Sequence, residues 1–453
     1  MNNKLERFKK SVCGKHIILL GAGVSNKPLI KQLLSYGAEV TVCDKNTEIQ
    51  DNFIDEMKLG AKFRFGDNYL DNLKCDIIFK TPGIRGDIDE LCKARKRGTL
   101  VTSEMEMFFK LCPCKIIGVT GSDGKTTTTT LIAKILTEDG KICHLGGNIG
   151  KPLLPEIEKI GENDVAVVEL SSFQLMSMKY SPDVAVITNI TPNHLDIHKS
   201  MEEYIGAKKN IFLNQNKSGV LVLNAKNEIT ASFAPEARGD VVFFCGEDSG
   251  VYLKDDVIYY DNKPIVNKKD IRLPGEHNVE NYMAAIAAVG KRINVESIKN
   301  VAKNFAGVEH RIEFVREVDG VSFYNDSIAS SPTRAKAGLY AFERKVILIA
   351  GGYDKKIPFD EFGEVVRDRV KRLYLFGATA PSIKDAVLKA YEPGKRPLPI
   401  VTQYTTLESI VKEAYMAAEA GDIVLLSPAC ASFDMFKNFE ERGKKFKEVV
   451  KKL

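Results

Sequence analysis

The sequence predicts an α/β protein with three consecutive units, each built on a mostly parallel sheet. Its length of 453 residues suggests three domains at about 150 residues each. Apolar, strand-like runs alternate with helical segments along the whole chain, which is the pattern of parallel sheets. Each strand-like run leads into a glycine-rich or polar turn. We expect domains at residues 1–104, 105–309 and 310–453.

Composition narrows the class of protein. A hydrophobic fraction of 44% with 28% charged residues is typical of a globular protein. The net charge of +5 is too small to indicate binding to nucleic acid or to an anionic membrane. No run approaches the ~18 apolar residues of a membrane span, and the charged N-terminus does not resemble a signal sequence. Nine scattered cysteines favour reduced thiols. We therefore expect a cytoplasmic protein without membrane insertion.

The first unit begins with a nucleotide-binding pattern. The apolar run HIILL leads into a turn containing Gly21 and Gly23, then a helix, then the strand EVTVCD, which ends at Asp44. This order is half of a Rossmann-like fold, in which the acid contacts ribose hydroxyls. Asn26 occupies the place of the third glycine, which makes NAD or FAD less favoured and leaves a purely structural βαβ unit as the alternative. A later strand, CDIIFK, ends in a second turn where open sheets bind ligands, formed by Thr81, Pro82 and Gly83.

The second unit begins with a phosphate-binding loop. The strand IIGVT leads through the loop that contains Gly121 and Gly124 into Lys125, Thr126 and a helix. In such loops the backbone N–H groups surround phosphates, the lysine reaches the outer phosphates and the hydroxyl binds Mg²⁺. Val119 stands where the strict pattern has glycine, so the loop is a variant, and an ordinary strand-turn-helix is the alternative. We expect the loop to bind a nucleoside triphosphate. Its contact residues would be Gly121, Ser122, Asp123, Gly124, Lys125, Thr126 and Thr127.

Two further strand ends of this unit carry candidate metal ligands. Glu169 lies at the end of the strand DVAVVEL, where an acid can hold the Mg²⁺ that bridges phosphates. Alternatively, Glu169 faces solvent. His194 follows the next strand in NITPNHLDIH and could serve the same metal or phosphate. We expect His198 to be a surface residue, because no third ligand accompanies it.

Several polar residues of this unit have ordinary structural explanations. Lys208 and Lys209 lie on a predicted helix, where a lysine pair usually marks a solvated face. Asn148, Asn278 and Asn281 lie near turns or a helix start and would be assigned to capping and hydrogen bonding. Residues 241–266 are expected to form a small antiparallel addition to the sheet.

The third unit again alternates strands and helices. The segments VSFYND, VILIAGG, RLYLFG and IVLLSPA precede a strongly basic terminal helix, and each strand delivers polar residues at its carboxyl end. The sequence therefore predicts a third ligand-binding sheet edge.

A series of motifs makes the pattern more specific. In order, the chain contains GVTGSDGKTTT, GGNIG, ELSSFQL, NITPNHLD, YIGAKK, GEHNVEN, EHRIEF, YNDSIAS and LSPACASFDMFKNFEERG. Together they resemble the Mur ligase family across essentially the whole chain, and the last stretch resembles the members that add D-glutamate. The resemblance implies a Rossmann-like N-terminal domain for a UDP-linked substrate, a central P-loop ATPase-type domain and a Rossmann-like C-terminal domain for the amino acid.

The resemblance also implies an activity and a set of partners. The activity is ATP-dependent addition of D-glutamate to UDP-N-acetylmuramoyl-L-alanine through an acyl phosphate, in peptidoglycan precursor synthesis, by an enzyme expected to be a monomer. ATP and two Mg²⁺ ions would be used, and Lys208 would be carbamylated. A carbamate is an anion, so Lys208 would change from a cation into an oxygen ligand for Mg²⁺.

The resemblance assigns roles to individual residues. The catalytic residues would be Lys125, His194, Lys208 and Arg311. The metal would be bound by Thr126, Glu169, His194 and Lys208. Besides the loop, ATP would contact Asn278, Asn281, Arg311 and Asp326, the last of which could instead order a domain junction. The UDP-linked substrate would contact Gly21, Gly23, Asp44, Thr81, Pro82, Gly83 and Asn148. D-glutamate would contact Lys355, Ser427 and Phe433.

One position departs from the family pattern. Ile328 stands where many relatives have lysine after Asp-Ser, so a cationic contact near the acyl phosphate or D-glutamate is missing. The Asn-Pro-Arg signature of the diaminopimelate-adding relatives is also absent around 330–332.

Other classes of protein remain as alternatives. Another amino-acid ligase of the superfamily, such as a folylpolyglutamate synthetase, would use the same chemistry, but it does not begin with a UDP-binding domain. A nucleotide-binding module without catalysis and a dinucleotide oxidoreductase are the others. We expect an enzyme because Lys125, Thr126, Glu169, His194 and Lys208 occur together.

Overall fold

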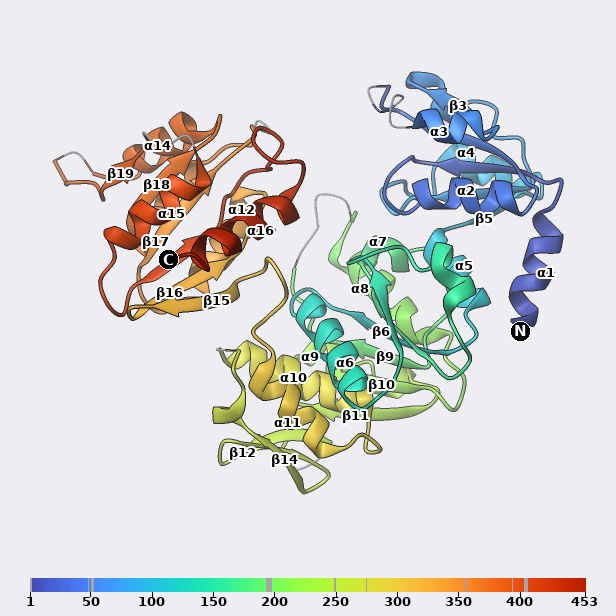
Figure 1. The fold of residues 1–453 in the computed structure, drawn as a ribbon. Coiled ribbons are helices and arrows are strands. Elements are labelled where there is room, and N and C mark those ends of the chain that lie inside the picture. Colours follow the sequence, from blue (N-terminus) through green and yellow to red (C-terminus); the bar gives the residue numbers. More distant parts are fainter. Residues whose placement is uncertain are drawn as a thin grey trace. The chain divides into compact units, whose positions relative to one another are not determined.

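The computed structural model describes residues 2–47, 49, 53–192, 198–247, 250–273, 275–354, 357–392, 394–402 and 406–453. The chain divides into two compact units, Met1–Asn304 and Phe305–Leu453. The first contains two sheets and the second contains one (Figure 1). The predicted α/β fold with three sheets is confirmed. The residue limits predicted for the three domains stay predictions. No helix of the described ranges is long and apolar enough to cross a membrane.

The first sheet is parallel throughout, with the strand order β3-β2-β1-β4-β5. Strands β2 and β3 are added to one side of β1, and β4 and β5 to its other side. The order of strand addition therefore reverses between β1 and β4, and open parallel sheets bind ligands at such a reversal. The strands are β1 (His16–Leu20), β2 (Glu39–Asp44), β3 (Lys62–Phe65), β4 (Ile77–Lys80) and β5 (Leu100–Thr102). The helices are α1 (Asn3–Val12), α2 (Lys27–Ser35), α3 (Ile54–Lys58), α4 (Asp89–Lys96) and α5 (Glu104–Leu111), with the 3-10 turn η2 (Asp67–Leu70).

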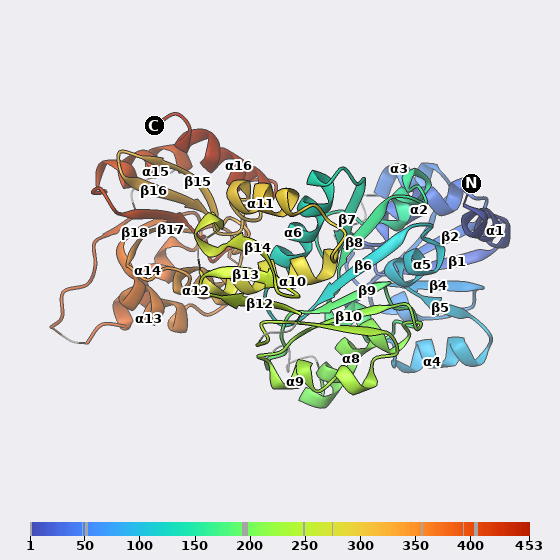
Figure 2. The same ribbon diagram turned by 90° about the horizontal axis from the view of Figure 1, so that it is seen from below.

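The central sheet has nine strands in the order β14-β13-β12-β11-β10-β9-β6-β8-β7. Figure 2 shows β8, β6, β9 and β10 following one another in this order. Pairing is antiparallel from β12 to β14 and parallel elsewhere, so the predicted antiparallel addition is confirmed for these strands, whereas β11 continues the parallel part. The strands are β6 (Lys115–Thr120), β7 (Cys143–Gly147), β8 (Val165–Glu169), β9 (Val184–Ile187), β10 (Val220–Asn224), β11 (Asp240–Phe244), β12 (Val251–Lys254), β13 (Val257–Tyr260) and β14 (Lys263–Asn267).

Helices and short 3-10 turns cover the central sheet. The long helix α6 begins at the phosphate loop, and α10 lies beside it (Figure 1). The helices are α6 (Lys125–Glu138), α7 (Ser172–Leu175), α8 (Met201–Leu213), α9 (Glu228–Ala231), α10 (Glu276–Val289) and α11 (Val295–Asn304), with η3 (Leu154–Lys159), η4 (Ala234–Glu236) and η5 (Lys268–Asp270).

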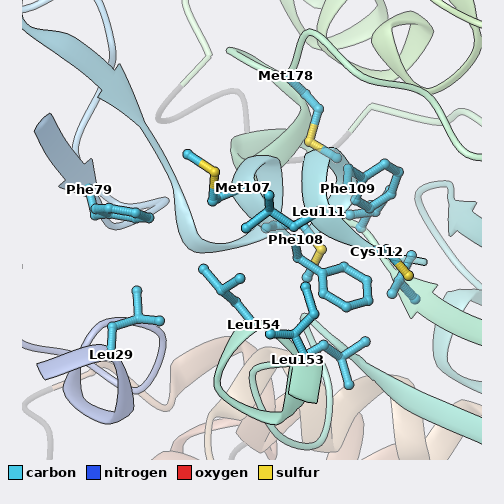
Figure 3. Packing of buried hydrophobic residues seen from close by; sticks show 14 of the residues in the cluster. Leu29, Phe79, Met107, Phe108, Phe109, Leu111, Cys112, Leu153, Leu154 and Met178 are labelled. Atoms are coloured by element: carbon cyan, nitrogen blue, oxygen red, sulfur yellow. The ribbon is translucent and has the colours of Figure 1, made fainter. Parts of the chain in front are cut away.

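One hydrophobic core joins the first two sheets. Helix α5 presents Phe108 and Leu111 to this core, which also contains Phe79 from β4, Leu29 from α2 and Leu154 from η3 (Figure 3). Phe108 and Phe79 are fully buried. Burial of apolar surface is worth about 25 cal/mol per Å², so this shared core holds the two sheets together within the first unit.

The second unit has one six-stranded sheet in the order β15-β16-β20-β17-β18-β19. Only the pair β15-β16 is antiparallel, and this edge hairpin was not predicted from the sequence. The strands are β15 (Glu313–Val318), β16 (Val321–Asn325), β17 (Val346–Gly351), β18 (Val370–Phe376), β19 (Ile400–Val401) and β20 (Ile423–Leu426). The helices are α12 (Pro332–Tyr340), α13 (Asp360–Arg369), α14 (Ala380–Lys389), α15 (Leu407–Met416) and α16 (Phe439–Val450), and separate cores cover the two faces of the sheet.

Candidate functional site

The phosphate loop runs from the end of β6 to the first turn of α6. Gly121 has φ +151°, and a Cβ there would lie 1.9 Å from the Thr188 hydroxyl oxygen. Only glycine fits this position, because a Cβ would also require Thr188, directly after β9, to move. Asp123 N–H donates to the Asn189 side chain at 2.8 Å, so residues after β9 hold the loop from the other side.

The loop side chains have defined positions. Lys125 Nζ donates to the carbonyls of Gly121 at 3.0 Å and Ser122 at 2.8 Å. Ser122 Oγ donates to Thr191 O and contacts the Tyr204 hydroxyl, both at 2.9 Å, and Thr127 is half-buried on the first turn of α6. The loop is therefore tied to α8 through Tyr204.

Glu169 lies directly beside this loop. Its carboxylate accepts the Thr126 hydroxyl at 2.7 Å on one oxygen and the Asn148 amide at 2.7 Å on the other. Strand β8 is the neighbour of β6, so the last residue of β8 meets the first turn of α6. Glu169 is 1% exposed, and the alternative of a solvent-facing residue is wrong. The expected contact of Asn148 with the UDP-linked substrate stays a prediction, and the structure shows its amide on the Glu169 carboxylate.

Lys208 is buried under the loop. Its side chain is 1% exposed, Nζ donates to Gly121 O at 2.7 Å, and the ammonium lies 4.7 Å from the Tyr204 ring centre. The expectation of a solvated lysine pair is wrong for this residue, because α8 packs its Tyr204–Lys208 face against β6. Burial, and next the charge of Lys125, lower the pKa of Lys208 to about 6. The amine is then mostly uncharged at neutral pH.

The two histidines have different outcomes. His194 lies outside the described residues. His198 is 1% exposed, stacks on Phe173 with ring centres 5.2 Å apart and contacts the Ser172 hydroxyl at 2.9 Å through Nε2. The expected surface position of His198 is wrong, because its ring packs on Phe173 and Ser172 of α7.

Two asparagines of α10 face the phosphate loop. Asn281 accepts the Thr128 hydroxyl at 3.2 Å through Oδ1 and donates to Asn278 Oδ1 at 3.2 Å. A Cβ at Gly124 would lie 2.3 Å from Asn281 Oδ1, so α10 approaches the loop closely. Both asparagines are buried, and the sequence placed them at a helix start without showing which element they contact.

In the first sheet the two predicted turns lie next to each other at the reversal of strand addition. Asp44 accepts Ala22 N–H at 2.7 Å and Asn46 N–H at 2.8 Å, so its carboxylate holds the turn that contains Gly21 and Gly23. Thr81 N–H donates to Leu20 O, which places the turn of Thr81, Pro82 and Gly83 beside the first one.

Asn26 has a role that sequence reasoning missed. It is fully buried, and its amide donates to Gly21 O at 2.9 Å and Phe79 O at 3.1 Å. The residue that replaces the third glycine thus cross-links both strand ends.

The second unit brings two predicted residues together. Asp326, after β16, accepts the Ser427 hydroxyl, after β20, at 2.7 Å. Asp326 is 3% exposed, and burial raises the pKa of its carboxyl group to about 7, while the charge of Arg311 opposes this shift. Arg311 is exposed in the turn before β15. Phe433 is 64% exposed and meets the Tyr353 ring edge-on, and Lys355 lies outside the described residues.

Arg442 is a second residue that sequence reasoning missed. Its guanidinium is fully buried and donates to backbone carbonyls of Ser327 at 2.9 Å, Cys430 at 3.1 Å and Ala431 at 3.2 Å. Arg442 therefore joins the loop that contains Ile328 to the loop that contains Ser427. The FEERG letters at the start of the terminal helix were the only signal.

Within the described ranges, no three side chains of His, Cys, Asp and Glu are grouped so that they could hold a metal ion. Thr126 and Glu169 supply a hydroxyl and a carboxylate, which are ligands that suit Mg²⁺. Mg²⁺ usually keeps waters and substrate phosphates as its other ligands, so these residues fit a nucleotide-bound Mg²⁺.

Comparisons with known proteins agree with this geometry. Residues 119–289 match the Mur ligase middle domain, and residues 310–430 match the Mur ligase glutamate ligase domain. The chain is 54% identical to the UDP-N-acetylmuramoylalanine--D-glutamate ligase of Acetivibrio thermocellus and 52% identical to that of Ruminiclostridium cellulolyticum, each with both chains covered completely.

Solved structures of lower identity share the fold. The UDP-N-acetylmuramate-alanine ligase of Thermotoga maritima has a TM-score of 0.57 at 20% identity, covering 97% of this chain and 99% of its own. The MurF ligase of Thermotoga maritima in complex with ADP has a TM-score of 0.56 at 18% identity, covering 91% and 95%. Since relatives more than half identical span the entire chain and two of its regions match Mur ligase domains, this chain belongs to the Mur ligase family.

Proposed function

We propose that this chain is an ATP-dependent ligase that joins D-glutamate to UDP-N-acetylmuramoyl-L-alanine in cytoplasmic peptidoglycan precursor synthesis. The identity of 54% over the full length to a ligase of that name carries the proposal. The loop of Lys125 and Thr126 beside Glu169 supplies the parts that phosphoryl transfer needs.

The reaction has two chemical steps. A carboxylate oxygen of the L-alanyl group attacks the γ-phosphorus of ATP, the bond to ADP breaks, and an acyl phosphate forms. The amine of D-glutamate then attacks the acyl carbon, loses a proton, and the C–O bond to phosphate breaks. Neither step needs a protein nucleophile, so the chain's task is to place charges and exclude water.

The residues of the loop can meet this need. Lys125 carries a positive charge at the N-terminus of α6, where the helix dipole also favours phosphate. Mg²⁺ bound with ATP would neutralise charge that develops on the phosphate oxygens. Thr126 and Glu169 would hold it, and His194 stays a predicted neighbour of a second ion.

Carbamylation of Lys208 is part of the proposal. CO₂ reacts with an uncharged amine, and burial keeps the pKa of Lys208 near 6. The carbamate would add an anionic oxygen ligand next to a loop that already contains Lys125. Lys208→Ala should be largely inactive and partly rescued by short carboxylic acids. Lys209→Ala is the matched control, since Lys209 pairs with Glu236 instead, and equal activity of both variants would contradict the proposal.

The remaining substrate contacts are proposed by domain. The turns of the first sheet, with Asp44, would bind the UDP end of the substrate, because they lie at the reversal of strand addition. In the second unit, Ser427, Phe433 and Lys355 would bind D-glutamate. Arg311 would contact the γ-phosphate, and the enzyme would act as a monomer.

An omission series tests the function. Phosphate release from ATP and Mg²⁺ is measured with UDP-N-acetylmuramoyl-L-alanine and D-glutamate together, and with each left out. We expect release only when both are present, and L-glutamate should not replace D-glutamate. Release with a folate and L-glutamate would instead indicate a folylpolyglutamate synthetase. Nucleotide binding without release under any combination would indicate a module without catalysis.

A further inference from the structure

A positively charged cavity lies in the first unit, away from the phosphate loop. Its volume is about 340 Å³, and it lies between the ends of β4 and β5 and the segment that follows α7. Three cationic side chains line it, from Lys80, Arg95 and Lys179, together with the hydroxyls of Thr102 and Ser177. Valine and methionine side chains form much of the rest.

Lys80 is the central residue of this cavity. It ends β4 and is only 4% exposed, which is unusual for a lysine. Its ammonium makes no hydrogen bond or ion pair with any residue of the described ranges. The pKa of Lys80 is lowered to about 8, chiefly by burial and in smaller part by the charge of Arg95, while the charge of Glu106 opposes this shift. An anion in the cavity would give the Lys80 ammonium the counter-ion that none of the described residues supplies in direct contact.

Arg95 reaches the same place from α4. Its Nη1 donates to Gly86 O at 2.6 Å. A Cβ built on Gly86 would lie 3.5 Å from Arg95 Nη2, 3.6 Å from Lys80 Cε and 3.7 Å from Ser177 Cβ. The guanidinium and the lysine stem therefore meet at one point of the cavity wall.

Among the described residues, Glu106 is the acid whose charge acts on Lys80. Its carboxylate accepts the Thr102 hydroxyl at 3.0 Å and is 7% exposed. Burial raises the pKa of Glu106, while Lys179 and Lys80 oppose this shift. Three cations against one carboxylate leave a net positive cavity.

We propose that this cavity is a binding site for a small anion that carries a phosphate group. Guanidinium, ammonium and hydroxyl groups are the usual partners of phosphate, and Arg95 offers the second edge of its fork. The volume is at the lower end for ligand pockets, so the organic part of the anion must be small. The proposal does not depend on the ligase assignment.

The site adjoins one of the predicted substrate turns. A second cavity of about 270 Å³ shares Lys80, Arg95 and Ser177 with the first and reaches Pro82 and Gly83. An anion at Lys80 would therefore sit next to the turn proposed for the UDP-linked substrate. This neighbourhood makes it necessary to test whether the site is separate from that substrate.

Equilibrium dialysis with labelled inorganic phosphate tests the proposal. Saturating Mg²⁺ and ADP fill the phosphate loop, and the ionic strength is held constant with chloride. We expect one phosphate per chain, at least a tenfold loss of affinity in Lys80→Met and about a tenfold loss in Arg95→Gln. Lys96→Gln, an exposed neighbour on α4, is the matched control and should bind as the unchanged chain does.

Three results would overturn the proposal. The first is no retained phosphate once ADP fills the loop. The second is equal affinity in the unchanged chain and both variants. The third is complete displacement by excess UDP, which would assign the cavity to the nucleotide-sugar site. Arg95 is exposed, so Arg95→Gln still decides the question if Lys80→Met does not fold.

Discussion

Carbamylation of Lys208 can be tested directly, because its buried amine should react with CO₂ in an unusual way. The ordinary pKa of a lysine is 10.5, and that of Lys208 is lowered to about 6. At pH 7.5 the uncharged fraction is then about 97%, against about 0.1% for an ordinary lysine, a difference of about a thousandfold.

The pH dependence gives the sharper signature. Between pH 7 and pH 9 the uncharged fraction of Lys208 rises only from about 90% to about 100%, whereas that of an exposed lysine rises about a hundredfold. At a fixed concentration of dissolved CO₂, the rate of carbamylation of Lys208 should therefore be nearly constant over this range.

The assay follows the carbamate signal by NMR after addition of ¹³C-labelled CO₂ to the protein. We expect one signal with a flat pH profile in the unchanged chain and in Lys209→Ala, and none in Lys208→Ala. A signal that survives in Lys208→Ala, or a rate that climbs tenfold with each pH unit, would refute the reasoning from burial.

Four further changes test other parts of the site. Glu169→Gln keeps the shape but removes the charge beside the loop, so turnover should fall about a hundredfold and a Mg²⁺ titration of phosphate release should shift to higher concentrations. Asp44→Ala should raise the KM for the UDP-linked substrate about tenfold and leave the KM for ATP unchanged, and steady-state kinetics with an unchanged KM for the former would remove that assignment. Gly121→Ala should abolish ATP binding in calorimetry, because its Cβ would collide with a threonine hydroxyl, whereas Gly206→Ala in α8 has free space and should bind normally. The carboxyl group of Asp326 has a pKa raised to about 7, so the folded chain holds its proton more tightly than the unfolded chain does. The free energy of unfolding should therefore fall by up to about 4 kcal/mol as the pH rises from about 4 to 7. The curve of Tm against pH should be flatter for Asp326→Asn.

The sequence predicted the residues at the carboxyl ends of strands well. Glu169, Asp44 and Thr126 follow or precede strong apolar runs, and the rule that ligands gather at one edge of a parallel sheet places them together. The structure has Thr126 and Glu169 in contact and Asp44 against the glycine turn. These positions follow from the order of strands and turns along the chain, which can be read directly from the sequence.

The environment of helical residues was less predictable. Lys208 and Lys209 are neighbours with the same chemistry, yet the first is buried against Gly121 and the second pairs with Glu236. Which face of α8 meets β6 depends on packing between distant segments. The same reason explains His198, whose burial arises from contact with Phe173 of α7.

The two lysines at the loop explain how Lys125 could change partners. In the structure Lys125 donates to the Gly121 and Ser122 carbonyls, and it must leave both to reach an outer phosphate. Lys208 donates to the same Gly121 carbonyl at 2.7 Å, so that acceptor stays satisfied when Lys125 moves. A carbamate retains one N–H on the Lys208 nitrogen, and it places a negative charge beside the Lys125 ammonium, which it attracts. Modification of Lys208 would therefore preserve the shape of the loop while adding a negative charge beneath it.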